Sequence, residues 1–160
     1  MTLIFISTAV HADAVSECND GSNIARQIHG CTEIIDHTMI TENLSIAYIN
    51  RGIAYAGQSQ SAKALADFSA SIAADRNNGI AYYDRGNIYF DLQNFEKAVA
   101  DYSKAIELEP DMTTAYLNRA MVNEILGVRV ASISDYRKAL ALDPLLSPAS
   151  SGLKRLGAAP

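Results

Sequence analysis

The side chains best suited to chemistry are two cysteines and two histidines near the start of the chain. Cys18, His29, Cys31 and His37 carry atoms that could bind zinc, and the cysteines could pair with each other. A zinc site usually shows ligands in close CxxC or HxxxH spacing, which does not occur here, and His29 and Cys31 would point to different faces of a helix. No metal is therefore expected, and the cysteines should form either a disulfide or two buried thiols.

Catalytic motifs are also missing from the sequence. A hydrolase needs a nucleophile beside a base, and outside the first 14 residues the only histidines are His29 and His37. No nucleophile elbow, phosphate-binding loop or dinucleotide-binding glycine pattern occurs. We expect neither an enzyme nor a cofactor. An enzyme subunit is the remaining alternative, and loss of turnover on replacing either histidine would support it.

Charged residues recur at a fixed interval of 34 positions. The arginines and aspartates that recur in this way could form a row of charges that binds a ligand. Alternatively, each arginine could form an ion pair with an aspartate of a neighbouring helix. We favour pairing, because packing itself demands this periodicity, and buried pairs help register more than net stability. The two columns are Arg51, Arg85 and Arg119, and Asp67, Asp101 and Asp135.

The same interval organises most of the chain into three segments, 45–78, 79–112 and 113–146. Within each segment, apolar residues follow a helical period on either side of a short polar break, which predicts two helices per segment. Pro110 and Pro144 close two of the segments, since proline cannot extend a helix, and in the first segment Arg76-Asn77-Asn78-Gly79 serves instead, since Asn is a good helix cap. The expected helices are 45–57, 61–74, 79–92, 95–108, 113–126 and 129–142.

Small and aromatic residues complete the repeat. Gly52, Gly86 and Ala120 share one column, and small residues there let two helices approach while an aromatic of the partner helix fills the adjoining space. With Tyr48, Tyr82 and Tyr116 ahead of them, and Phe68, Tyr102 and Tyr136 in the second helices, these segments resemble the tetratricopeptide repeat family. The resemblance implies an all-α fold, an α-α superhelix of stacked helix pairs, that binds other proteins.

The resemblance also implies a binding surface, because the first helices of such arrays line a concave groove. Counting from the packing residues, this face carries an unusually apolar stripe, and exposed apolar patches mark interaction sites. It lacks the Lys, Asn and Arg cluster with which some members bind a C-terminal carboxylate. The groove could instead be covered by the chain itself or by a second copy in a homodimer. The predicted groove residues are Ile49, Ile53, Ile80, Tyr83, Asn87, Phe90, Leu117 and Met121, flanked by Ile46, Thr114 and Glu124.

The two ends should cap the stack. Residues 15–44 are interpreted as a degenerate repeat with a helix near 23–36, and residues 147–160 as a capping helix that begins after Ser147 and ends at Gly157. If Cys31 takes the place of a second-helix aromatic, Cys18 falls in a column that contacts it. The repeat alignment therefore favours a Cys18–Cys31 disulfide, which the loop-entropy model values at about 3 kcal/mol.

The start of the chain and its composition bear on location. Residues 1–14 hold an apolar run followed by Ala12-Asp13-Ala14, which is typical of a signal peptide cleaved after Ala14, although no basic residue precedes it. The net charge of −5 argues against nucleic acid, and no apolar run reaches the roughly 20 residues that span a bilayer. We expect an exported bacterial protein, periplasmic or secreted, with a cytoplasmic protein as the alternative. Its expected function is that of a scaffold for an unknown protein or peptide, or alternatively a structural homo-oligomer.

Overall fold

A computed structural model describes residues 12–38 and 40–159, which form helices joined by short turns. The chain divides into two compact units, Met1–Arg76 and Asn77–Pro160. Each unit is described by itself.

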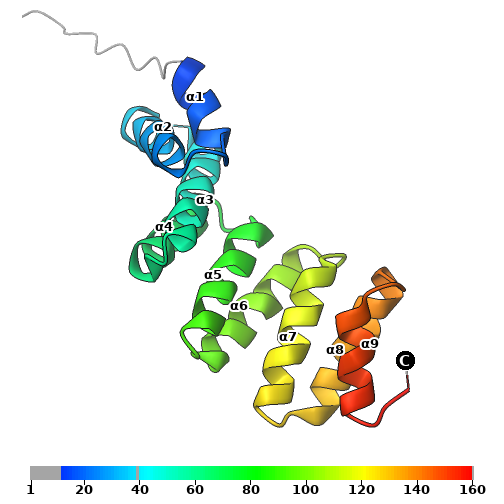
Figure 1. Ribbon diagram of the computed structural model, residues 1–160. Coiled ribbons are helices and arrows are strands. Elements are labelled where there is room, and N and C mark those ends of the chain that lie inside the picture. Colours follow the sequence, from blue (N-terminus) through cyan, green and yellow to red (C-terminus); the bar gives the residue numbers. More distant parts are fainter. Residues whose placement is uncertain (1–11, 39, 160) are drawn as a thin grey trace, which may run out of the picture. The chain divides into compact units, whose positions relative to one another are not determined.

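The first unit contains helices α1 (Ala12–Asn19), α2 (Ile24–His37), α3 (Thr41–Gly57) and α4 (Ser61–Ala74). Each helix packs against the next one, and α1 also contacts α3 (Figure 1). The expected helix 61–74 coincides with α4, and the expected helix near 23–36 is shifted by one residue.

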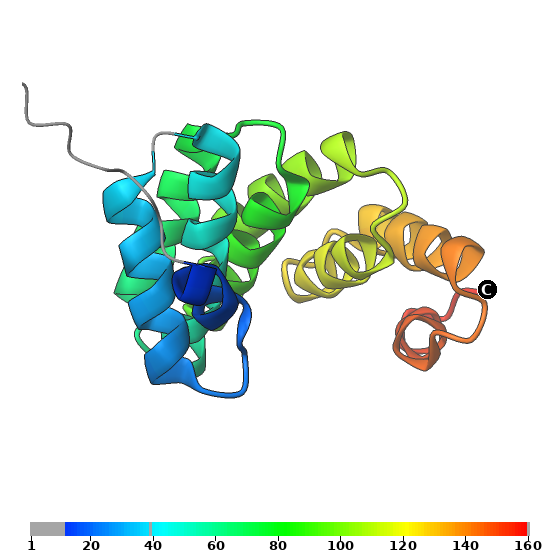
Figure 2. The ribbon, with the colours of Figure 1, turned by 90° about the horizontal axis from the view of Figure 1, so that it is seen from above.

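The second unit contains α5 (Gly79–Asp91), α6 (Phe95–Leu108), α7 (Thr113–Ile125), α8 (Arg129–Leu142) and α9 (Ser147–Arg155). Consecutive helices again pack on each other (Figures 1 and 2), and α9 also contacts α7. The predicted bounds of α5 to α8 are matched to within one residue, because prolines, glycines and Asn78 mark the ends. Asn78 caps α5 by accepting a hydrogen bond from the Ala81 N–H.

In the three repeats, small residues on the first helix receive an aromatic ring of the second helix, as the repeat columns predict. A Cβ added to Gly86 would lie 2.8 Å from the ring of Tyr102, whose side chain is fully buried. Phe68 lies against Gly52 in the same way. These rings and the alanines around them form the core of each helix pair.

The arginine and aspartate columns form ion pairs within the helix pairs, which confirms the structural interpretation. Each guanidinium makes two parallel hydrogen bonds of 2.8 Å to its aspartate, which is buried. Hydrogen bonding to the carboxylate raises the pKa of all three arginines. The side chain of Arg51 also donates to Thr32 of α2, and Arg119 donates to Ser103 of α6. These arginines therefore tie their repeat to the preceding second helix.

The predicted disulfide between Cys18 and Cys31 is present and joins α1 to α2. The two sulfurs belong to a cluster of buried small side chains that includes Ala14 of α1 and Ala47 of α3. The predicted leader lies largely outside the described residues, but its last three residues begin α1. Cleavage after Ala14 would remove this first part of the helix, including a side chain that is 1% exposed.

Three boundaries differ from the prediction, and one of them is the end of α9, which lies at Arg155 rather than at Gly157. Helix α3 begins at Thr41 rather than at residue 45, since no helix-breaking residue separates Thr41 from the repeat. Ser147 is the first residue of α9 and not its cap, with proline following it in the first turn. As predicted, α9 covers the last repeat: Leu153 is fully buried, and Gly152 lies against the ring of Tyr136.

Candidate partner-binding surface

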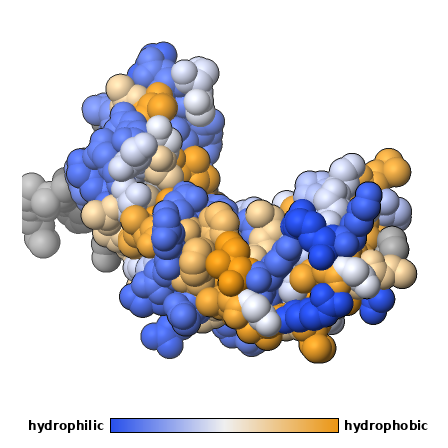
Figure 3. Space-filling model, turned by 60° about the horizontal axis from the view of Figure 1, so that its bottom comes forward, coloured by the Kyte–Doolittle hydropathy of each residue, from blue (hydrophilic) through white to orange (hydrophobic). Residues whose placement is uncertain are grey.

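The predicted groove residues of the second unit lie on one side of α5 and α7, and most remain accessible. Ile80 is 46% exposed and Met121 is 36% exposed. Tyr83, Phe90 and Leu117 are half-buried. This set, together with Asn87, is named the α5–α7 surface. Figure 3 shows that apolar side chains gather in patches among hydrophilic ones on one face of the molecule.

A hydrogen-bonded chain of polar groups joins the two helices of the α5–α7 surface. The amide oxygen of Asn87 accepts from the hydroxyl of Tyr102, at 2.9 Å, and from the amide of Asn118, at 3.0 Å. Asn118 also donates to the Tyr83 hydroxyl at 3.3 Å. Burial raises the pKa of Tyr102, so its hydroxyl keeps its proton and remains a donor. These four side chains therefore hold α5 and α7 at one separation.

Apolar residues close the other end of the same surface. Phe90 and Met121, which come from different helices, line a small cavity of about 50 Å³ with Asn118. The Phe90 ring is further supported by Phe95 of α6, with ring centroids 6.0 Å apart. Two predicted groove residues that are distant in sequence are thereby brought together.

Where the α5–α7 surface borders helix α9, the charged side chains form ion pairs with each other. Arg155 of α9 donates two hydrogen bonds to the carboxylate of Glu124, at 2.8 and 2.9 Å, and the Tyr136 hydroxyl donates to the same group. The bonds from Arg155 lower the pKa of Glu124. Met121, Glu124, Ile125 and Arg155 surround a cavity of about 240 Å³ at this border.

The first unit gives a mixed result for the predicted groove residues. Ile46 and Ile53 are exposed on α3, at 47% and 46%. Ile49 was expected on the exposed stripe, but it is only 7% exposed. Helix α3 packs against α1, α2 and α4, so its buried arc is wider than a single stripe. Ile49 is therefore a core residue of this structure.

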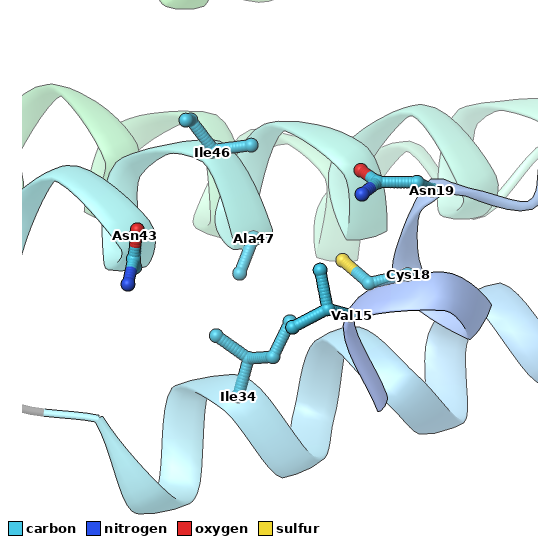
Figure 4. A pocket seen from close by; sticks show the side chains of 7 residues that line it. All are labelled: Val15, Cys18, Asn19, Ile34, Asn43, Ile46 and Ala47. Carbon is cyan, nitrogen blue, oxygen red and sulfur yellow. The ribbon is translucent and has the colours of Figure 1, made fainter. Parts of the chain in front are cut away.

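A cavity of about 290 Å³, which the sequence analysis does not predict, lies among α1, α2 and α3. Figure 4 shows side chains from all three helices directed toward it. The floor and sides are mainly apolar, and two amides lie at its edge. Its lining residues are Val15, Cys18, Asn19, Ile34, Asn43, Ile46 and Ala47.

The cations near the α5–α7 surface are already paired. Arg119 is bound to Asp135, and Arg155 is bound to Glu124. Among the described residues, no group of three His, Cys, Asp or Glu side chains is placed to hold a metal ion. His29 instead hydrogen-bonds to Glu17 of α1, at 3.0 Å.

Two residues that shape this surface are not among the predicted ones, namely Asn118 and Arg155. Asn118 does have a sequence signal, because Asn50, Asp84 and Asn118 form a polar column at the repeat interval. Asn50 makes the corresponding bond in the first unit, donating to Asn19 of α1 at 3.0 Å. Arg155 gives no such signal, because α9 lies outside the repeat period.

Comparison with known proteins points to one family of folds. Residues 79–112 match the family model described as tetratricopeptide repeat. No curated protein sequence matches the chain.

Solved structures give the same fold. The Arabidopsis OM64 TPR domain is 27% identical, with a TM-score of 0.70, covering 73% of this chain and 97% of that domain. The first TPR of Spaghetti (RPAP3), bound to the HSP90 peptide SRMEEVD, is 25% identical, with a TM-score of 0.69 and coverage of 71% and 90%. The second TPR domain of human RPAP3, in complex with the HSP70 peptide SGPTIEEVD, is 24% identical, with a TM-score of 0.70 and coverage of 74% and 99%.

Proposed function

This chain is built of tetratricopeptide repeats, and we propose that it is a scaffold that binds a partner protein through an apolar peptide on the α5–α7 surface. The observation that carries the proposal is the exposure of Ile80 and Met121 beside half-buried Phe90 and Leu117. Exposed apolar patches of this kind usually mark an interaction site. The fold supports a role in protein interaction, since two similar TPR structures contain bound peptides.

The chemistry of the surface suggests the kind of peptide. The peptides bound by the two RPAP3 domains end in Glu-Glu-Val-Asp and are acidic. The α5–α7 surface itself contains no lysine or arginine, and the guanidinium group of Arg155 at its border is held by the carboxylate of Glu124. An acidic tail would gain little there. We therefore propose an amphipathic helix or an extended apolar segment, for which the Asn87–Asn118 pair offers polar contacts.

The experiment compares substitutions on and off this surface. Phe90→Asp and Leu117→Asp should abolish capture of the partner in pull-downs from the native compartment, while helicity by circular dichroism is kept. Val130→Asp is the matched control, because Val130 is 82% exposed on α8 and lies outside the surface. Unchanged capture with both surface variants would exclude the α5–α7 surface.

A structural homo-oligomer is the second candidate, favoured by the same exposed apolar side chains. Light scattering of the purified protein separates the two functions. A monomer at micromolar concentration would exclude the oligomer, whereas a dimer that Phe90→Asp dissociates would exclude an open peptide-binding surface.

We further propose that the protein is exported to an oxidising compartment. The disulfide supports this, because such bonds persist mainly outside the cytoplasm. Within the described residues, no helix has the length and apolar character needed to cross a membrane. Two reactive thiols in folded protein taken from that compartment would contradict the proposal.

A further inference from the structure

Helix α1 has little packing of its own. It is eight residues long, below the length at which an isolated helix is stable in water. Among its described side chains only Ala14 and Cys18 are buried, and Val15 remains 48% exposed. The apolar contact that it makes with the rest of the unit is therefore small.

The polar contacts of α1 are exposed. Glu17 pairs with His29 and Arg26 of α2, whose side chains are 73% and 63% exposed, and exposed pairs contribute little to stability. Asn19 accepts one hydrogen bond from Asn50 of α3. Asn50 also donates to the Cys18 sulfur at 3.8 Å. Gly30 of α2 lies close to α1: a Cβ added there would lie 2.5 Å from the carbonyl oxygen of Ala14 and 2.6 Å from the Cβ of Glu17.

The disulfide lies between this weakly packed helix and the core. Both cysteines are buried, Cys31 at 0% and Cys18 at 2% exposed, but only Cys18 is among the residues that line the 290 Å³ cavity. Figure 4 shows the Cys18 sulfur directed toward the space between α1 and α3. A small thiolate in the cavity would thus meet the Cys18 sulfur first.

We propose that the Cys18–Cys31 disulfide is a redox latch that holds α1 in place and maintains the cavity among α1, α2 and α3. A dithiol reductant opens it in two steps. One thiolate attacks the Cys18 sulfur and displaces the Cys31 thiolate, which takes up a proton. The second thiolate then releases Cys18 as a thiol, and the reductant leaves as its own disulfide.

Opening the latch removes one wall of the cavity. Val15, Cys18 and Asn19 leave with α1, and the side chains beneath them become accessible to solvent. Ile34 and Ala47, which are 7% and 1% exposed in the closed form, are the main apolar groups uncovered. A binding cavity in this unit therefore exists only in the oxidised protein.

Hydrogen exchange on the full chain tests the latch without any partner. With dithiothreitol, amides of α1 should exchange roughly 100-fold faster, the factor that loop entropy predicts for a bridge of this length. Helix α9 is the internal control, because it is an end helix of nine residues without a disulfide and should not change. The Cys18→Ser, Cys31→Ser double variant should reproduce the effect without reductant.

Two outcomes would overturn the latch. Equal exchange in α1 before and after reduction, with free thiols confirmed by alkylation, would show that other contacts hold the helix. Loss of protection across α2, α3 and α4 as well would show that the disulfide supports the whole first unit and not α1 alone.

Discussion

The helix pairs α1/α2 and α5/α6 solve the same packing problem by different means. In α5/α6 the fully buried ring of Tyr102 covers Gly86, and Arg85 is bonded to Asp101. In α1/α2 the buried cluster contains no aromatic ring, and the close approach occurs at Gly30, on the second helix of the pair. The disulfide holds this pair together.

The free energies involved explain why a disulfide can take the place of a buried aromatic ring. Burying a large side chain contributes about 2–3 kcal/mol, and a bridge that closes a loop of this size contributes about 3 kcal/mol. The covalent bond thus replaces roughly one buried aromatic. Within the described part of the chain, α1 packs mainly on α2 and α3, so this pair has little other packing to rely on. The difference is that a disulfide depends on redox conditions, whereas a packed ring does not.

The largest expected effect comes from removing the ring of α5/α6. Tyr102→Ala should destabilise the protein by about 3–5 kcal/mol, because Gly86 has no side chain to fill the space left behind. Urea unfolding followed by circular dichroism measures this. Tyr102→Phe, which removes only the hydrogen bond to Asn87, should cost about 1 kcal/mol. Equal losses in the two variants would refute the role assigned to the ring.

Adding a methyl group at the glycine where the helices cross, in α1/α2 and in α5/α6, tests the comparison of the two pairs further. Gly30→Ala should cost about 1–3 kcal/mol, since its Cβ would meet backbone atoms of α1 that cannot move aside. Gly86→Ala should also destabilise, by about 1 kcal/mol and less than Gly30→Ala, because its Cβ would lie 2.8 Å from the buried ring of Tyr102, which must shift, and Ala120 is accommodated in the same column beside the buried Tyr136. Thermal unfolding of both variants measures which one is less stable. A larger loss of stability for Gly86→Ala than for Gly30→Ala would contradict the tighter backbone approach assigned to α1/α2.

The smallest expected effect concerns Asp84, in the column where Asn50 and Asn118 are hydrogen-bonded. Burial raises its pKa to about 6, so the folded protein holds this proton more tightly than the unfolded chain, whose value is 3.8. Ionisation of Asp84 therefore costs stability above pH 6, and the cost fades as the pH falls toward 4. Asp84→Asn should stabilise by on the order of 1 kcal/mol at pH 8 and by nothing at pH 4.

Denaturant midpoints at the two pH values test this expectation. Asp91→Asn is the control for the loss of one negative charge, because Asp91 is an exposed acid on the same helix. A gain from Asp84→Asn that is equal at both pH values would rule out ionisation as its cause.

The sequence by itself determined the helix bounds, the packing columns and the arginine–aspartate pairs. A 34-residue period reports which face of each helix is packed, and the residues that end helices act locally. For that reason the repeat columns alone match Gly86 with Tyr102, and Arg119 with Asp135. The disulfide follows from the same alignment.

Only the tertiary structure decided how side chains from separate repeats meet. Asn118 contacts Asn87 across 31 residues of sequence, and Arg155 reaches Glu124 from a helix outside the period. The burial of Ile49 and the cavity among α1, α2 and α3 likewise depend on the number of helices around α3. The sequence period indicates which side of a helix a side chain is on. Contacts between side chains of separate repeats also depend on how several helices are placed relative to one another.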